Sequence, residues 1–240
     1  MHSRLLHDIA RERIRPVRTE LRAGTTRWNV TDPLPDAGCL GIELGVAAGS
    51  FSARMVQSGR FRHFFGVDVY GDGHNVQEYK KALRTVGLMA RYSLLRMTFD
   101  QALDLFPDGF FDFVYCDGYA HTGEEGGRTL IDWYPKLKSG GVMAGDDYDA
   151  ESWPLVVWAV NHVVAELDVV LNVTDLVSDE PYNRYRSWHF TKPESGAPAR
   201  IAPAADLAEV GDLEKARIAE KRRQRNKGQR ASRDSPPSEN

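Results

Sequence analysis

Cysteine is scarce in this sequence of 240 residues, where only Cys39 and Cys116 occur. Two cysteines do not make a disulfide framework, and no Cys-x-x-Cys pair is present for zinc or dithiol chemistry. In the strand arrangement expected below, an offset of about four residues at ~3.3 Å each holds them roughly 13 Å apart. That separation is too large for a disulfide bond. We therefore expect both residues to be reduced, buried and small apolar members of the core.

Long apolar runs and a strong charge of one sign are also lacking. No run approaches the roughly 20 residues that span a bilayer, and residues 1–8 lack the apolar core of a secretory signal. The net charge of −3 gives no reason to expect nucleic acid as the main partner. The composition, 42% hydrophobic and 27% charged, is typical of a soluble globular domain. The sequence predicts a cytoplasmic protein without a membrane partner and leaves a homo-oligomer open.

Short apolar runs alternate with segments of helical period between residues 37 and 192. The expected strands are 39–44, 64–69, 92–97, 111–116 and 141–144, and the expected helices are 50–58, 76–86, 99–106, 124–137 and 153–167. Two further strands, 168–173 and 185–191, are expected to form an antiparallel hairpin that closes the sheet edge. Such alternation implies a sheet with both faces covered by helices. The sequence predicts a doubly wound α/β fold with a mostly parallel, seven-stranded sheet and an antiparallel edge strand.

The two ends of the chain differ from this central domain in composition. Residues 1–36 are expected to form an N-terminal helical extension and a linker. Residues 193–240 begin rich in Pro, Ala and Gly and become dominated by charged and polar residues, so they are expected to form a disordered, charged tail. A helix over 213–224 would be a solvated one. The basic run 221–227 could contact phosphates, but the composition favours a solvated tail.

A glycine-rich turn after the first expected strand carries the strongest functional signal. It reads Glu43-Leu44-Gly45-Val46-Ala47-Ala48-Gly49-Ser50, and such a turn lets a ligand approach the backbone closely at the ligand-binding edge of an α/β sheet. Its Glu-x-Gly-x-x-x-Gly spacing differs from the Gly-x-Gly-x-x-Gly pattern of dinucleotide sites. A carboxylate there opposes a pyrophosphate but suits an ammonium group. S-adenosylmethionine offers such a group beside its sulfonium.

Asp68 lies near the end of the second expected strand, and its carboxylate can accept hydrogen bonds from both hydroxyls of a ribose, in this cofactor or in NAD. Glu43, the Gly45–Gly49 spacing and Asp68 together resemble the class I S-adenosylmethionine-dependent methyltransferases, which have a Rossmann-like fold. The resemblance implies that Glu43 and the turn, with Gly45, Ala47, Gly49 and Ser50, hold the amino acid part and that Asp68 holds the ribose. Where relatives carry an acidic-Ser pair near the adenine, this sequence has Thr98 and Phe99.

A second carboxylate cluster is expected where the fourth and fifth strands end. Asp117 follows the fourth strand, and Asp146 and Asp147 follow the fifth. The resemblance to class I enzymes implies that these two strands are neighbours, which would bring the three carboxylates together, where they repel unless a cation or protons intervene. Oxygen ligands from two strand ends suit Mg²⁺, which could lower the pKa of a bound substrate hydroxyl. The alternative is that these aspartates cap helices or face solvent.

The run from Phe111 to Tyr148 resembles a narrower family. Its Asp-Gly with a following His, its Trp-Tyr-Pro-Lys-Leu-Lys-Ser-Gly-Gly stretch and its Gly-Asp-Asp-Tyr ending look like the macrocin-type O-methyltransferases. The same run is more distantly similar to the catechol-type O-methyltransferases. The resemblance covers roughly residues 38–190. It implies methyl transfer to a hydroxyl of a sugar or small metabolite.

The same resemblance implies roles for the carboxylates. Asp117, Asp146 and Asp147 would be the Mg²⁺ ligands, and Asp117 would also border the cofactor and take part in catalysis. Catechol-type enzymes have a lysine base three residues after the first metal aspartate, where this sequence has Ala120. The adjacent His121 can act as a base near neutral pH, so we predict it as the second catalytic residue.

The acceptor is expected to be a small molecule or glycan, and aromatic residues are candidates to stack on it. Tyr148, Trp153, Tyr182 and Tyr185 lie in segments expected near the crevice mouth. Three alternatives stay open at this point. They are a metal-independent N-methyltransferase, a non-catalytic S-adenosylmethionine-binding or scaffolding module, and a nicotinamide oxidoreductase, which the glycine spacing disfavours.

Overall fold

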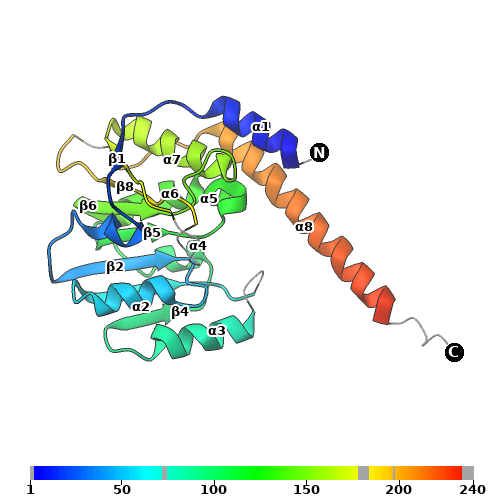
Figure 1. Ribbon diagram of the computed structural model, residues 1–240, viewed down its shortest axis with the longest axis horizontal. Coiled ribbons are helices and arrows are strands. Elements are labelled where there is room, and N and C mark those ends of the chain that lie inside the picture. Colours follow the sequence, from blue (N-terminus) through cyan, green and yellow to red (C-terminus); the bar gives the residue numbers. More distant parts are fainter. Residues whose placement is uncertain (1–2, 72–74, 178–183, 197, 234–240) are drawn as a thin grey trace.

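The structure, a computed structural model, describes residues 3–71, 75–177, 184–196 and 198–233, with side chains to residue 225. Within these residues, eight strands form one sheet in the order β1-β7-β8-β6-β5-β2-β3-β4 (Figure 1). The strands are β1 Thr19–Arg22, β2 Cys39–Leu44, β3 Phe61–Val67, β4 Tyr92–Leu95, β5 Phe111–Cys116, β6 Leu137–Gly145, β7 Leu171–Thr174 and β8 Trp188–Thr191. Only β8 runs antiparallel to its neighbours β6 and β7 among these pairs.

Helices connect most of the parallel strands. They are α1 Ser3–Arg13, α2 Ser50–Gln57, α3 Val76–Ala82, α4 Phe99–Leu103, α5 Gly123–Gly126, α6 Arg128–Trp133, α7 Pro154–Leu167 and α8 Ala205–Arg233. Shorter turns are η1 Arg27–Thr31, η3 Ala120–Thr122 and η4 Tyr134–Lys136, and η2 Leu83–Gly87 is a π-helical turn. The doubly wound, mostly parallel α/β fold predicted from the sequence is confirmed.

Two apolar cores cover the two faces of the sheet. Along β5, Val114 and Cys116 join a core that includes residues of α1, α4, α6, α7 and α8. The alternate residues Phe113 and Tyr115 join a second core with residues of η1, α2 and η2. Since successive side chains of a strand point to opposite faces, this division shows that helices bury both faces. Both Cys39 and Cys116 are free and buried, as expected.

The sheet differs from the prediction in strand number and in the place of the antiparallel strand. Residues 19–22 pair in parallel with β7, from Thr19 opposite Leu171 to Arg22 opposite Thr174, where the sequence suggested a helix. All four side chains of β1 are exposed, so no apolar alternation marks the strand in the sequence. β7 and β1 therefore lie beyond β8, and the antiparallel strand is inside the sheet.

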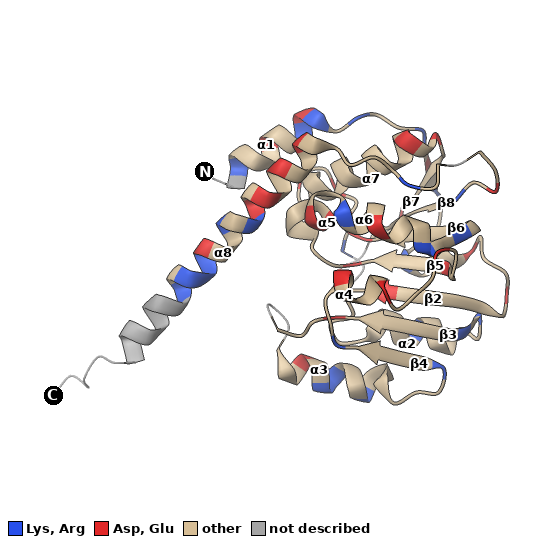
Figure 2. Ribbon diagram, turned by 180° about the vertical axis from the view of Figure 1, so that it is seen from behind, with Lys and Arg blue, Asp and Glu red and all other residues tan. Residues whose placement is uncertain are grey.

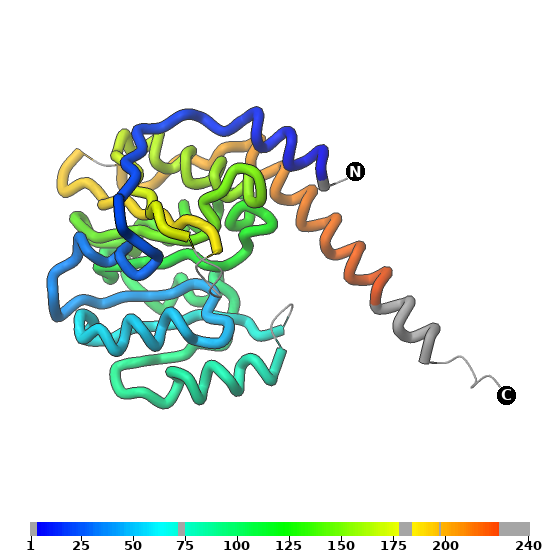
Figure 3. The backbone as a smooth tube through the Cα atoms, viewed as in Figure 1, coloured from blue at the N-terminus to red at the C-terminus, as the bar shows by residue number. Residues whose placement is uncertain are grey.

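The C-terminal segment also differs from the prediction, because residues 205–233 form one long helix, α8. Figures 1 and 3 show that α8 starts beside α1 and continues away from the sheet. Leu207, Val210 and Glu214 are buried, and their spacing of three and four residues places them on one helix face. This face, rather than the average composition of the segment, fixes the helix to the domain. In the described part of the chain, no helix has the length and apolar character needed to cross a bilayer.

We predict that Gly211→Ala destabilises the protein. A Cβ on Gly211 would lie 2.8 Å from the Cα of Gly126 and 3.1 Å from the carbonyl oxygen of Thr122, and these backbone atoms of α5 and η3 cannot easily move. Overpacking of this kind costs about 1–3 kcal/mol, against a gain in helix propensity of about 1 kcal/mol. We expect Tm to fall by about 4 °C. Glu209→Ala, at an exposed position of the same helix, is the control, and a Tm of the Gly211 variant at or above the wild-type value would contradict the close contact.

Candidate active site

The glycine-rich turn after β2 lies directly against the end of β5. Gly45 has a φ of +100° and Gly49 a φ of +85°, a region that favours glycine. A Cβ on Gly45 would lie 2.3 Å from the carbonyl oxygen of Asp117. The backbone N–H of Asp117 also donates to the carbonyl of Leu44 at 2.9 Å. The sequence therefore needs glycine at position 45 for conformation and for space.

Asp68 holds the turn from the end of β3. Its Oδ2 accepts hydrogen bonds from the backbone N–H groups of Val46 at 3.1 Å and Ala47 at 3.0 Å, and its Oδ1 accepts from Tyr70 N–H at 2.9 Å. The Tyr70 hydroxyl in turn donates to the carbonyl of Ala47 at 2.9 Å. A carboxylate has about four lone-pair positions, so Asp68 keeps acceptor capacity toward a ligand.

Glu43 is a buried carboxyl group below the turn. It accepts a hydrogen bond from the hydroxyl of Ser52, which itself accepts one from the Tyr92 hydroxyl at 3.0 Å. Burial raises the pKa of Glu43 well above its usual range. A cation that enters the space above it would favour the ionised form.

Two adjoining cavities extend from this turn along the carboxyl edge of the sheet. The smaller one, about 160 Å³, is lined by Arg27, Glu43, Gly45, Val46, Ala47, Ser50, Phe51 and Asp117. The larger one, about 590 Å³, is lined on the sheet side by Gly45, Asp68, Val69, Thr98, Phe99, Asp117 and Gly118, and farther out by Tyr119, Ala120, His121, Thr122, Glu125 and four residues of α8. Gly45 and Asp117 line both cavities. An elongated ligand lying over Gly45 could therefore reach into both.

The carboxylates at the ends of β5 and β6 are held together by Arg27, which the sequence analysis did not single out. The register of β5 and β6 places Cys116 opposite Gly145, so Asp117 and Asp146 follow neighbouring strand ends, as expected. Arg27 Nη2 lies 2.9 Å from Asp117 Oδ2, and Arg27 Nη1 lies 3.2 Å from Asp146 Oδ2. The Ser187 hydroxyl also donates to Asp146 Oδ1 at 3.1 Å. One guanidinium thus bridges two strand ends.

The guanidinium of Arg27 is buried and surrounded by aromatic rings. The side chain is 1% exposed, and its Cζ lies 5.5 Å from the ring centroid of Trp28, 5.2 Å from that of Phe51 and 5.5 Å from that of Tyr115. Burial alone would lower the pKa of Arg27, but its neighbours, Tyr115 and Asp117 foremost, raise it above the usual value. Arg27 is therefore cationic at neutral pH.

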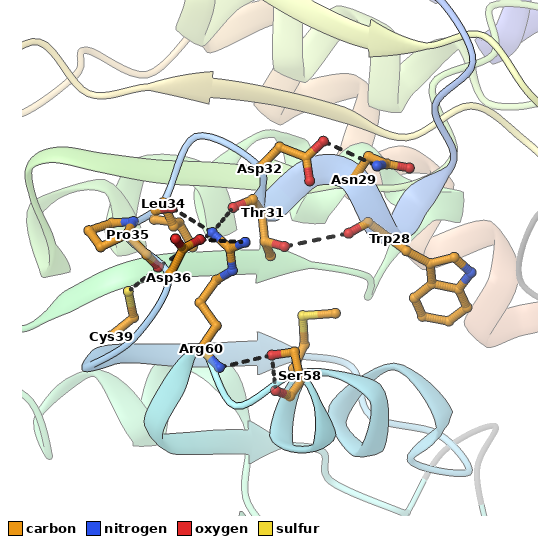
Figure 4. A network of polar contacts seen from close by, with 11 residues as sticks. Trp28, Asn29, Thr31, Asp32, Leu34, Pro35, Asp36, Cys39, Ser58 and Arg60 are labelled. Atoms are coloured by element: carbon orange, nitrogen blue, oxygen red, sulfur yellow. Dashed lines mark hydrogen bonds and ion pairs between the residues drawn. The ribbon is translucent and has the colours of Figure 1, made fainter.

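The loop that carries Arg27 is anchored on both sides. Before it, the carboxylate of Asp175 accepts hydrogen bonds from Gly24 N–H at 2.9 Å and Thr25 N–H at 3.0 Å. After it, Figure 4 shows the Arg60 guanidinium among the carbonyl groups of the loop. Arg60 donates to Thr31 at 3.0 Å and also to Leu34. These contacts fix η1 relative to β7 and β3, so the position of Arg27 is determined by the fold.

Two further carboxyl groups lie close to this cluster. Burial, and then the charges of Asp146 and Asp117, raise the pKa of Asp147 to about 8. Glu124 is 2% exposed, and burial, followed by the charges of Asp147 and Asp117, raises its pKa well above the usual range. In the described residues, Glu124 Oε2 has no hydrogen-bond partner. The site therefore concentrates acidic groups whose ionisation is costly.

The predicted magnesium site does not fit these residues. Two of its three expected ligands, Asp117 and Asp146, already direct oxygens at the guanidinium of Arg27. Among the residues that the structure describes, no group of three or more acidic, histidine or cysteine side chains is arranged to hold a metal ion. The prediction of a magnesium site assumed three carboxylates without a compensating charge. In the structure, Arg27 supplies that positive charge, so these carboxylates do not need a metal ion.

The other expected site residues lie around the larger cavity. Thr98 caps α4 by accepting a hydrogen bond from Gln101 N–H at 3.3 Å, and Phe99 packs against Tyr119 with ring centroids 4.8 Å apart. His121 is exposed, and its ring packs edge-on against Trp153 at 4.9 Å. The candidate cofactor-binding residues and the candidate base therefore line the same cavity.

The aromatic residues expected near the crevice mouth differ in their placement. Trp153 packs edge-on against Tyr185 at 5.8 Å and supports His121. The Tyr148 hydroxyl donates to Asn161 Oδ1 on α7 at 2.9 Å and is engaged there. Tyr182 lies outside the described residues.

Helix α8 forms an outer wall of the larger cavity, which the sequence analysis missed. Lys215, Ile218, Ala219 and Arg222 line it, and Lys215 Nζ lies 3.1 Å from Glu125 Oε2. Figure 2 shows that the described outer part of α8 is mostly basic. The signal in the sequence is the helical spacing of Leu207, Val210, Glu214 and Ile218.

We predict that Glu124→Gln changes how stability depends on pH. The folded-state pKa of Glu124 is raised, so the folded protein binds this proton more tightly than the unfolded chain does. The contribution to stability is full below the unfolded pKa, about 4.3, and is lost as pH rises toward the folded pKa. The Tm of the variant minus that of the wild type should therefore increase as the pH rises from 4.5 through neutral. Glu209→Gln, at an exposed position, serves as control, and a difference that stays constant over this range would contradict the assignment.

Comparison with known proteins relates the region around the two cavities to one protein family. Residues 40–148 match a protein-family model described as a methyltransferase domain. This stretch begins in β2 and ends just beyond β6, so it contains the glycine-rich turn and the carboxylates after both strand ends. No match to a curated protein was found.

Solved structures share the fold at low sequence identity. A complex of a putative methyltransferase with the Trm112 methyltransferase activator from Haloferax volcanii aligns with a TM-score of 0.53 and 14% identity, over 70% of this chain and 89% of that chain. Spermidine synthase from Thermotoga maritima aligns with a TM-score of 0.53 and 16% identity, over 72% and 59%.

A third structure aligns over a smaller region. An S-adenosylmethionine-dependent methyltransferase from Mesorhizobium loti has a TM-score of 0.40 and 22% identity, over 51% of this chain. The chain spans 54% of the length of that relative. Residues 40–148 are thus similar to a methyltransferase domain, and the solved structures aligned above a TM-score of 0.5 share the fold of this chain.

Proposed function

We propose that this chain is an S-adenosylmethionine-dependent methyltransferase that transfers a methyl group to a hydroxyl of a sugar or another small metabolite bound in the larger cavity. The observation that supports the proposal is that Gly45 and Asp117 line both cavities. The cofactor can then extend from one cavity to the other, with its methyl group near their junction. The remainder of the larger cavity, toward His121 and α8, is left for the acceptor.

The residues of the turn fit the cofactor chemically. Glu43 is a buried carboxyl group in the smaller cavity, where the ammonium group of the cofactor would compensate its burial. Asp68 has acceptor capacity toward a ribose, and Thr98 and Phe99 line the same cavity, next to the expected adenine position. When bound, S-adenosylmethionine supplies an electrophilic methyl carbon and leaves as a neutral thioether. The protein must align the acceptor oxygen with that carbon, which is catalysis by proximity.

His121 is the proposed proton acceptor. It lines the larger cavity, and the edge-on contact with Trp153 orients its ring. As the acceptor oxygen gains the methyl group, its proton passes to a ring nitrogen of His121, which then releases it to solvent because the residue is exposed. Histidine is the side chain most often used for general base catalysis.

We predict that Gly45→Ala weakens binding of S-adenosylhomocysteine at least tenfold, roughly 1.4 kcal/mol. The added Cβ meets the carbonyl oxygen of Asp117, and alanine is strained at the φ of Gly45. Isothermal titration calorimetry measures the effect. Gly59→Ala is the matched control, because Gly59 also has a positive φ of +74° but no atom lies within 4 Å of its added Cβ. Equal affinities in the two variants would contradict the proposed cofactor position.

We predict that His121→Ala lowers kcat by about 10²–10⁴-fold. Radiolabelled S-adenosylmethionine and a panel of acceptors, some with hydroxyls and some with amines, identify the acceptor first. His63→Ala is the control, since His63 lies on β3 and bonds to Ser93 at 2.9 Å. Methylation of amines alone would overturn the hydroxyl assignment, and unchanged kcat in the His121 variant would overturn the role of this base.

A further inference from the structure

Arg27 lies where two carboxylates meet at the edge of the cofactor site. It reaches Asp117 after β5 and Asp146 after β6 with two different nitrogens, at 2.9 Å and 3.2 Å. It also lines the smaller cavity together with Glu43. The residue comes from η1, 90 positions before Asp117 in the sequence, and is part of neither strand. The presence of Arg27 in the site therefore does not follow from the two strands that carry the aspartates.

We propose that the guanidinium of Arg27 is a built-in cation that takes the place of a divalent metal ion at Asp117 and Asp146. Arg27 is then a positioning residue. It compensates the charge of both carboxylates and fixes their orientation beside the cofactor, so the enzyme needs no divalent ion at this site. The inference rests on the proposed function only in that the site is the one used for methyl transfer.

The chemistry of the guanidinium supports this assignment. Arginine stays charged, and its planar group presents several N–H donors that can contact two carboxylates at once. Mg²⁺ would need the same oxygens at about 2.0–2.1 Å. A metal ion placed there would also lie close to the positive charge of Arg27, which is held in place by aromatic rings on several sides. The two cations therefore exclude each other.

The anchoring of η1 shows that the guanidinium is a fixed part of the site. Arg27 is 1% exposed, so it cannot swing into solvent to admit a metal ion without moving the loop. That loop is bound to Asp175 before Arg27 and to Arg60 after it. A metal ion could bind between Asp117 and Asp146 only after Arg27 is removed.

The test is a titration of the full chain with Mn²⁺, without cofactor or acceptor. Calorimetry and electron paramagnetic resonance detect the bound ion. We expect no saturable binding to the wild type. Arg27→Met keeps an apolar side chain of similar length and should bind one equivalent of Mn²⁺, with a rise in Tm of about 3 °C when the ion is saturating. The double variant Arg27→Met/Asp117→Asn should lose this binding.

Matched variants separate the charge of Arg27 from a general structural effect. Arg54→Met removes another guanidinium that lies over the Trp28 ring, at 5.1 Å, and should behave like the wild type. Guanidinium chloride at low concentration should compete with Mn²⁺ in Arg27→Met, which a merely structural role would not produce. If Arg27→Met does not fold, Arg27→Lys retains a cation and should bind no Mn²⁺, while the wild-type titration alone can still overturn the proposal.

Two results would overturn the proposal. One is saturable Mn²⁺ binding to the wild type that Asp117→Asn abolishes, and the other is a folded Arg27→Met that binds no Mn²⁺. Since the titration uses neither cofactor nor acceptor, a failure to find methyl transfer leaves its result unchanged. If the Mn²⁺ titration overturns the role of Arg27, the cofactor-binding test with Gly45→Ala is likewise unaffected.

Discussion

The paired contacts of one buried guanidinium with two strand-end carboxylates are the constraint on which the site depends. Without Arg27, Asp117 and Asp146 would face each other at the edge of the sheet with burial and repulsion uncompensated. Removing one partner from such a buried group typically costs about 3–5 kcal/mol. A fixed cation requires a fixed loop, and the hydrogen bonds of Asp175 and Arg60 to the segments around η1 provide it. A short turn outside the matched family region therefore determines the electrostatics of the site.

The glycine-rich turn after β2 and the carboxylate cluster are joined by direct contacts. Asp117 donates its backbone N–H to Leu44, at the end of β2, and its carbonyl oxygen occupies the space that a side chain on Gly45 would need. Asp68 binds the other side of the turn through Val46 and Ala47. Displacement of Asp117 would thus move the backbone that we propose to hold the cofactor. In this way the ion pair of Arg27 with Asp117 is connected to the turn of the proposed cofactor site as well as to the carboxylates.

The sequence predicted the sheet better than it predicted the site. β2 and β5 have the predicted bounds, because a continuous apolar run bounded by turn residues marks a strand buried on both faces. The meeting of Asp117 and Asp146 was also predictable, since parallel neighbours end at one edge. Arg27 was not, because its contact spans 90 residues and nothing local distinguishes a buried arginine from an exposed one. β1 has only exposed side chains, so only its backbone pairing with β7 reveals it.

Helix α8 shows why the average composition of the C-terminal segment does not predict its structure. Its first turns pack through Gly211 against α5, with no room for a side chain between the two backbones. One turn later Lys215 contacts Glu125, in the segment that follows His121. The helix is thereby tied to the part of the chain that carries the proposed base, and its residues close the outer side of the larger cavity. Under the proposed function, the space available to an acceptor is set by a segment outside the matched methyltransferase domain, and substrate choice on a shared fold commonly depends on such segments.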